Sequence, residues 1–162
     1  MGHSYGCYGP LLNGSTTVIY EGKPVGTPDA SSFFRIIDDH KIVSSFWSPT
    51  ALRIIRQNDL DNEHSRKYPM KHLRSLFVAG EHCDTDTLLW ARKVFGGKPV
   101  VDHYWQTETG APVTAVCLGI EQSPVSKIKR IVFFSLQISF VFQRISAHPV
   151  LQVVHVLVMT SI

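Results

Sequence analysis

The residues from Asp102 to Gly110 form the densest group of chemically useful side chains in this sequence. The run reads Asp-His-Tyr-Trp-Gln-Thr-Glu-Thr-Gly, so it combines large aromatic rings with an amide, hydroxyls, carboxylates and a glycine. It follows the apolar residues Pro99, Val100 and Val101, which are typical of a strand. Aromatic faces beside hydrogen-bonding groups suit a flat, charged ligand better than they suit core packing. The run therefore predicts a binding site where a strand ends.

Alternating strand and helix patterns over residues 16–110 must position this run. Apolar, β-branched segments predict strands over 16–20, 42–46, 73–79 and 99–101, and the first of these is expected to be short and buried. Short loops between strands and helices predict an α/β fold, a parallel sheet with flanking helices on both faces. In such sheets ligands bind beyond the carboxyl ends of the strands. Gly80-Glu81 and the Asp102 run both stand at such ends.

Capping residues predict where the helices begin and end. Thr27 is expected to cap a helix that has Pro28 at its first position, Asp29 in its first turn and its end near residue 40. Ser48-Pro49 predicts a second helix in the same way. Acids at 84 and 86 predict a third, which a left-handed cap at Gly96-Gly97 closes. Residues 58–68 are polar and predict a solvated connection.

Composition limits the classes of protein to consider. At 162 residues, 44% hydrophobic and 18% charged, the chain can form a globular domain. A formal charge of +3 without a Lys/Arg stripe gives no reason to expect a nucleic-acid partner. The three cysteines have no Cys-x-x-Cys spacing, which favours reduced thiols in an intracellular compartment. Neither a targeting peptide nor an apolar run of the roughly 18 residues that span a membrane is predicted.

The composition changes after Gly119. Residues 120–162 contain no Gly, Asn, Asp, Tyr or Trp, and Glu121 is their single acid. Domains normally use Gly, Asn and Asp in turns, so this stretch is unlike the part before it. Its apolar segments have high β-propensity and predict aggregation if they are exposed. We expect two parts, a domain segment over 1–119 and an apolar tail over 120–162.

Several blocks together resemble the AMP-forming acyl-CoA synthetases of the adenylate-forming superfamily. Besides the Asp102 run they are Gly2-His3-Ser4-Tyr5, Pro49-Thr50-Ala51-Leu52-Arg53 and Ala79-Gly80-Glu81. These blocks resemble the short-chain acetyl and propionyl synthetases, and the Gly-Glu-His form is most similar to the mitochondrial, propionate-preferring type. The resemblance covers residues 2–119. It implies a fragment of the large N-terminal domain of an adenylate-forming enzyme, a partial AMP-binding domain.

The resemblance implies an acid–thiol ligase that works in two half-reactions. A short-chain carboxylate, propionate or acetate, attacks ATP to give an acyl-adenylate and pyrophosphate, and CoA then displaces AMP. The co-substrates and cofactors implied are ATP, Mg²⁺ and CoA. All of these partners are small molecules, and the implied location of the parent enzyme is the mitochondrial matrix.

The resemblance also assigns candidate site residues. The acyl pocket would use Ala79 and Trp105, and Glu108 would bind Mg²⁺. His82 stands where acetyl synthetases have Pro. Val25 stands where they have an Asn near CoA, so no CoA contact is assigned there. No catalytic residue is assigned in this sequence. The nucleotide-binding residues implied are Gly80, Glu81, His82, Asp102, His103, Tyr104, Trp105, Gln106 and Thr107.

Other interpretations of these residues stand beside the resemblance. Taken alone, Trp105 fits a core residue and Glu108 a surface carboxylate. The sequence contains no Gly-x-x-x-x-Gly-Lys-Ser/Thr phosphate loop, and the family's upstream phosphate loop and downstream catalytic lysine have no counterpart. We therefore expect an incomplete fragment that is inactive by itself. The alternative is a non-catalytic remnant or a partner-binding fragment.

Overall fold

The computed structural model describes residues 6–20, 22–23, 25, 28–110 and 112–115, together with the backbone of 156–158. Gly2 to Tyr5 and most of the predicted apolar tail lie outside these residues. The described elements in chain order are α1 (Gly9–Leu12), β1 (Val18–Tyr20), α2 (Ser32–Asp39), β2 (Ser44–Trp47), α3 (Pro49–Asn58), α4 (Glu63–Arg66), β3 (Ser75–Val78), α5 (Thr85–Val94), β4 (Val100–Tyr104), β5 (Thr114–Ala115) and β6 (Val156–Val158).

The main sheet has the strand order β2-β3-β4-β5. The pairs β2–β3 and β3–β4 are parallel, and the antiparallel strand β5 is at the far edge. Strands β1 and β6 form a separate parallel pair. The prediction of an α/β fold with a mostly parallel sheet and flanking helices is confirmed.

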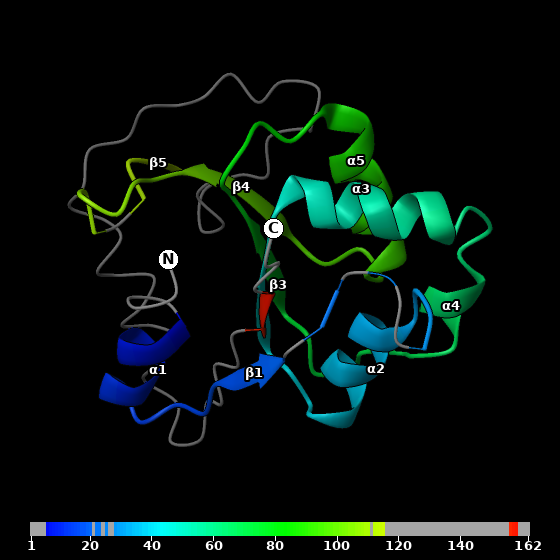
Figure 1. Ribbon diagram of the computed structural model, residues 1–162, viewed down its shortest axis with the longest axis horizontal. Coiled ribbons are helices and arrows are strands. Elements are labelled where there is room, and N and C mark those ends of the chain that lie inside the picture. The colour runs from blue at the N-terminus through cyan, green and yellow to red at the C-terminus, as the bar shows by residue number, and fades with distance from the viewer. Residues whose placement is uncertain are drawn as a thin grey trace.

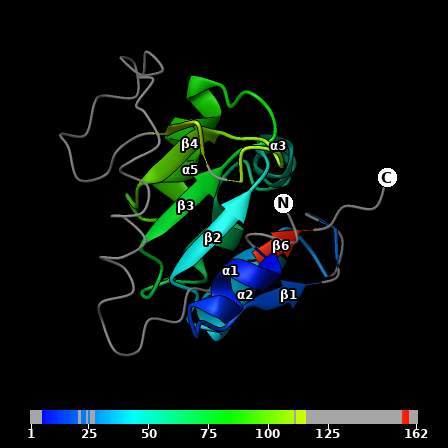
Figure 2. The same cartoon turned by 90° about the vertical axis from the view of Figure 1, so that its left-hand side faces the viewer.

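Helices α2, α3 and α5 lie on the same face of the main sheet (Figures 1 and 2). The strands β2, β3 and β4 are added in one direction across the sheet. Crossover connections are right-handed in nearly all proteins, so strands added in one direction place their helices on one face. The described part of the chain therefore shows the predicted helical cover on this face. Helices on both faces need a reversal of strand order, which β2-β3-β4 does not have.

The hydrophobic core fills the space between these helices and the sheet. Trp47 at the end of β2 is 1% exposed, and its ring packs against Phe33 of α2 and Phe95 after α5, with centroid distances of 5.0 and 5.8 Å. Edge-to-face pairs of this kind stabilise a core beyond their buried area. The other aliphatic members of the cluster include Ile37, Ile42, Leu52, Ile55, Leu73, Leu76, Val78 and Val100.

Two of the three predicted helix starts are correct. In α3 the Ser48 hydroxyl accepts a hydrogen bond from Ala51 N at 3.2 Å, and α5 begins at Thr85, directly after its N-cap Asp84. The predicted end of α5 is also correct, since Gly96 and Gly97 follow it with φ of +66° and +76°. The prediction for α2 is wrong, because this helix begins at Ser32. Asp29 instead accepts a bond from Ser31 N at 2.7 Å, which forms a turn ahead of the helix. Thr27 lies outside the described residues.

Two further local predictions are corrected. Strand β1 is less buried than expected, since Ile19 is 67% exposed. The stretch 58–68 is more ordered than a solvated connection, because it contains α4 and the buried carboxylate of Asp59. That carboxylate accepts bonds from His64 N and Ser65 N at 3.0 and 3.2 Å. The Asp59 carboxylate thus satisfies backbone N–H donors at the start of α4. The sequence indicated only that this stretch is polar, and gave no sign of the helix.

Candidate nucleotide-binding edge

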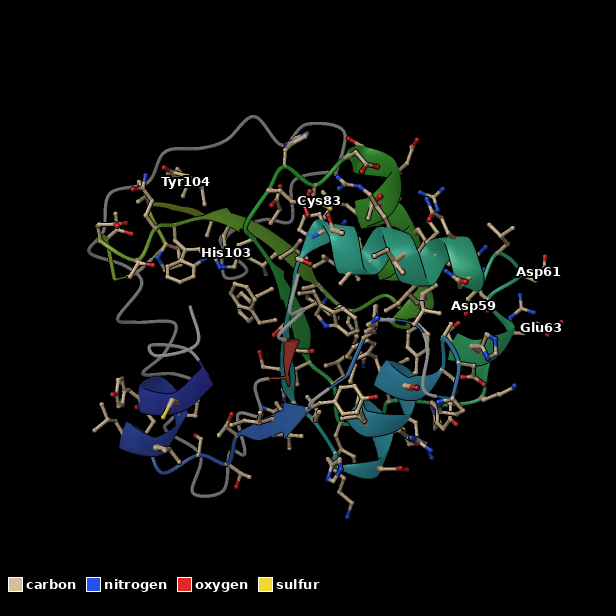
Figure 3. The ribbon with its side chains drawn as sticks, viewed as in Figure 1. Asp59, Asp61, Glu63, Cys83, His103 and Tyr104 are labelled. Carbon is tan, nitrogen blue, oxygen red and sulfur yellow. The ribbon has the colours of Figure 1, made fainter. Side chains whose placement is uncertain are left out.

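The loops after β3 and β4 begin at the same edge of the sheet. Val78 pairs with Asp102 in the parallel register, so Ala79 continues beside His103. The structure thus brings together the two segments that the sequence predicted to lie at strand ends. Figure 3 shows His103 and Tyr104 on β4, with Cys83 towards the beginning of α3.

The first loop, residues 79–84, turns at Gly80. Ala79 is buried, while Gly80 has φ of +104°, a conformation that side chains other than hydrogen rarely allow. Glu81 then points its carboxylate back to the start of α3. Its Oε1 accepts bonds from Thr50 N at 2.9 Å and from the Thr50 hydroxyl. The Thr50 hydroxyl bond, with help from Arg53, holds the pKa of Glu81 below its usual value.

Arg53 of α3 contacts three residues of the same loop. Its Nη1 lies 3.1 Å from Glu81 Oε2, and its Nη2 donates to the carbonyl oxygen of His82 at 2.9 Å. Its Nε donates to Asp84 Oδ2 at 3.0 Å. The Asp84 bond contributes most to raising the pKa of Arg53, so the guanidinium stays charged.

Asp84 is the N-cap of α5. Its Oδ1 accepts a bond from Thr87 N at 2.8 Å, and its Oδ2 accepts the Thr87 hydroxyl at 2.9 Å. The backbone bond from Thr87 is the largest cause that lowers the pKa of Asp84 to about 2. The interpretation of this acid as a helix-start residue is therefore confirmed. Among the described residues, no group of three or more His, Cys, Asp or Glu side chains is placed to hold a metal ion.

Replacing Asp84 by alanine should lower the free energy of unfolding by about 1 kcal/mol near pH 7, the usual effect of losing an N-cap. Because the folded pKa is depressed, this contribution is present above the ordinary value of 3.8 and is lost as the pH falls towards about 2. Urea unfolding at several pH values measures both effects. Asp84→Asn is the matched control, since Asn also caps helices. Equal stability of Asp84→Ala and the natural chain at pH 7 would contradict the cap.

Cys83 of this loop is buried as part of the hydrophobic core. It is 2% exposed, and burial, with the negative charge of Asp102 second, raises the pKa of its thiol to about 12. A thiol that keeps its proton at neutral pH is a weak nucleophile. Cys83 is therefore a packing residue of the loop.

The first three residues of the Asp102 run belong to β4 itself, which corrects the prediction that the run follows the strand. The antiparallel pairs His103–Ala115 and Tyr104–Thr114 extend the strand beyond its apolar part. Asp102 continues on the helix-covered face, because it pairs with Val78.

His103 occupies the opposite face of the sheet. It is 6% exposed, and its ring makes edge contacts with Phe46 and Phe77 at centroid distances of 5.2 and 5.8 Å. Burial lowers the pKa of its imidazole, so the ring is neutral at physiological pH. The His103 side chain therefore packs in an aromatic row, and Trp105 continues this row with its ring 6.4 Å from Phe46.

The rest of the run forms a tight turn. Gln106 N donates to the Thr109 hydroxyl at 3.0 Å, and that hydroxyl donates to Gln106 O at 2.8 Å. Gly110 has φ of +65° and donates its N–H to Thr107 O at 3.3 Å. The side chains of Thr107 and Glu108 are consequently exposed at the turn. The Gln106 amide donates to the Tyr104 hydroxyl.

Comparison with known proteins shows the family. A model described as AMP-binding enzyme matches residues 1–138. The chain belongs to the AMP-binding enzyme family. The predicted resemblance to adenylate-forming enzymes is confirmed by this match.

Individual relatives of this AMP-binding chain are acyl-CoA synthetases by name. It is 55% identical over 123 residues to acyl-CoA synthetase short-chain family member 3, mitochondrial, of Mus musculus, a match that covers 76% of this chain and 18% of the mouse protein. It is 40% identical over 113 residues to member B of Dictyostelium discoideum, covering 70% and 16%. It is 41% identical over 116 residues to acetyl-coenzyme A synthetase of Chromobacterium violaceum, covering 70% and 17%. The chain thus spans less than a fifth of each of these relatives.

The AMP-binding chain brings its predicted site residues together in different ways. Gly80, Trp105, Thr107 and Glu108 lie in two loops that begin at adjacent strand ends. Two other side chains make contacts within the protein instead. Glu81 bonds to Thr50 and Arg53 of α3, and the His103 ring packs in the aromatic row. Thr50 and Arg53 were assigned no role from the sequence. Both residues belong to the Pro49-to-Arg53 block of the family resemblance, which could have marked them as candidates. The sequence does not show which residues of the 79–84 loop they contact.

Proposed function

We propose that this chain carries the nucleotide-binding edge of an AMP-forming, short-chain acyl-CoA synthetase. The observation that supports it best is the meeting of the Gly80 loop and the Trp105–Gly110 turn at one sheet edge. Such edges are the ligand-binding sites of parallel sheets. The proposed reaction joins propionate or acetate to CoA through an acyl-adenylate, in the complete enzyme that contains this segment.

The two loops have different parts in this proposal. The Glu81 carboxylate already bonds to Thr50 and Arg53, so the first loop would offer its backbone groups, from Gly80 to His82, to the adenine. The backbone from Asp102 to Thr107 would bound the nucleotide on the other side. His103 would contribute its main chain, because its ring is buried.

Trp105 and Ala79 would limit the size of the acid. Trp105 is half-buried, and Ala79 is a small buried residue on the neighbouring strand end. A large ring beside a small side chain leaves room for a short acyl chain only. The relatives named short-chain synthetases and acetyl-coenzyme A synthetase support this class of acid.

Glu108 fits the proposed Mg²⁺ ligand. Its carboxylate is exposed on the turn, and Mg²⁺ is commonly held by one or two carboxylates together with substrate phosphates. When bound, the ion would neutralise charge on the phosphates of ATP. The names of the mouse and Dictyostelium relatives support a mitochondrial location. No helix among the described residues has the length and apolarity to cross a membrane.

Binding of AMP to the 162-residue chain tests this function. Trp47 and Trp90 are buried in the core, whereas Trp105 lies at the proposed site, so AMP should change the fluorescence of the chain through Trp105. We expect a saturable change in the natural chain and its loss in Trp105→Phe, with Trp90→Phe as the matched control. If the fluorescence of the chain does not change at AMP concentrations well into the millimolar range, the alternative of a non-catalytic remnant would be favoured over the proposed function.

The same samples should release no pyrophosphate from ATP with Mg²⁺ and propionate. The matched segment is 18% of the mouse relative, so most of that protein's length has no counterpart here. Each missing electrostatic contact to a reacting group typically costs on the order of 10² in rate. Turnover at an ordinary enzymatic rate would show that the chain is sufficient by itself.

A further inference from the structure

Helix α3 fastens the first nucleotide loop through two side chains of its first turns. Thr50 and Arg53 are three positions apart, so they share a face of the helix. Thr50 bonds to one carboxylate oxygen of Glu81, and Arg53 lies 3.1 Å from the other. Both oxygens of Glu81 are therefore oriented by α3.

Arg53 reaches further along the loop than Thr50 does. Besides Glu81 it binds the carbonyl oxygen of His82 at 2.9 Å and the Asp84 carboxylate at 3.0 Å. The guanidinium is planar, so its donors have fixed relative directions. One rigid group thus sets the positions of two carboxylates and one backbone carbonyl between Gly80 and the start of α5.

This stretch of the loop is the part that requires such support. Gly80 gives the chain a turn at φ +104°, and residues 81–84 belong to no helix or strand. In the proposed function the nucleotide contacts are made by the backbone of Gly80, Glu81 and His82. An error in the position of that backbone would weaken binding without any change in the residues that touch the ligand.

We propose that Arg53 is a positioning residue for nucleotide binding, which holds the loop from Gly80 to Asp84 in the conformation that receives the adenine. The inference rests on the proposed function, and it adds a residue that contacts no substrate. Its action goes through Glu81, the His82 carbonyl and Asp84.

Alkylation of Cys83 measures how firmly the loop is held, without any need for enzymatic activity. The thiol is buried within the loop, so iodoacetamide reaches it only when the loop opens. Arg53→Gln should raise the alkylation rate of Cys83 about tenfold, which corresponds to about 1.4 kcal/mol of opening free energy. Mass spectrometry of the Cys83 peptide separates it from Cys7, which is exposed and serves as the internal standard.

The direction of this change is informative. The positive charge of Arg53 lowers the pKa of Cys83, so loss of that charge alone would slow the alkylation. A faster reaction therefore reports opening of the loop. Arg56→Gln, on the same helix, is the matched control and should leave the rate unchanged. Arg53→Lys keeps the charge but not the planar group, and it should fall between the natural chain and Arg53→Gln.

Adding AMP to the same alkylation reaction tests whether the conformation of the loop affects nucleotide binding. We expect AMP to slow the alkylation of Cys83 in the natural chain, and the AMP concentration for half protection to rise about tenfold in Arg53→Gln. The melting temperature of each variant, followed by circular dichroism, identifies global unfolding. If Arg53→Gln unfolds, Arg53→Lys carries the comparison.

Each result decides between the two proposals. An unchanged Cys83 rate in Arg53→Gln and Arg53→Lys would overturn the role of Arg53, even if AMP protects the natural chain. A faster rate with an unchanged AMP requirement would show that Arg53 orders the loop but does not serve the nucleotide, which also overturns the inference. No protection of the natural chain by AMP would overturn the proposed function first, and the positioning role with it.

Discussion

Replacing Trp47 by alanine is expected to lower the free energy of unfolding by about 3–5 kcal/mol, the usual range for removing a buried aromatic side chain. Trp47 is 1% exposed and packs between Phe33 and Phe95. Its indole N–H also donates to the Ser45 hydroxyl at 2.6 Å, so the substitution leaves that buried hydroxyl without its donor. Domains are stable by only about 5–15 kcal/mol, so the loss would remove a large part of the free energy of unfolding.

Urea or thermal unfolding measures the effect of Trp47→Ala. The matched control is Leu89→Ala on α5, because Leu89 is 50% exposed and should change stability by less than about 0.5 kcal/mol. Similar losses for the two variants would mean that the aromatic cluster does not stabilise the domain as the structure indicates.

In the complete synthetase that is proposed to contain this segment, Trp105→Gly is expected to move the acid preference from short-chain towards medium-chain acids. A pocket that gains or loses one methylene of space changes discrimination by about 1–3 kcal/mol, or roughly 10- to 200-fold in kcat/KM. Removal of a whole indole opens space for several methylenes. Efficiency with acetate and propionate should fall, because in the proposed pocket the small acids would lose their contact with the ring.

Comparing kcat/KM across a series of acids tests the role of Trp105. Glu108→Ala provides the contrast, since the proposed Mg²⁺ ligand would act on the phosphates and not on the acid. Its turnover should fall by a similar factor for every acid, with the chain-length profile unchanged. If Trp105→Gly kept the natural profile, Trp105 would be a packing residue at the end of the row that begins with Phe46.

The sequence predicted those parts of the fold that are decided locally. Ser48 and Asp84 cap their helices because the capping bonds run to residues three positions later. The apolar segments before Gly80 and Asp102 predicted β3 and β4, and the parallel arrangement then placed both loops at one edge. The family resemblance rested on residues beside these segments, at 49–53, 79–81 and 102–110, and also on Gly2 to Tyr5.

Contacts between residues far apart in the sequence could not be predicted from local sequence patterns. Arg53 bonds to groups 28 to 31 positions later, and its own neighbours in the sequence give no indication of them. The sequence likewise did not show that pairing with β5 extends β4 through His103. The resemblance suggested Glu81 as a nucleotide contact but did not show that its carboxylate bonds to Thr50, which only the packing of α3 beside the loop reveals.

The two loops of the candidate site differ in the chain separation of their contacts, and this difference implies an order of folding. The turn after β4 closes through bonds between residues three positions apart and between Val113 N and Tyr104 O at 2.8 Å. Hairpins with such short-range contacts form in about 1–10 μs. The Gly80 loop depends on a helix that is distant in the chain, so it must wait for the slower assembly of the parallel strands. The candidate nucleotide-binding edge is therefore completed last on its Glu81 side, after the parallel strands have brought α3 beside the Gly80 loop.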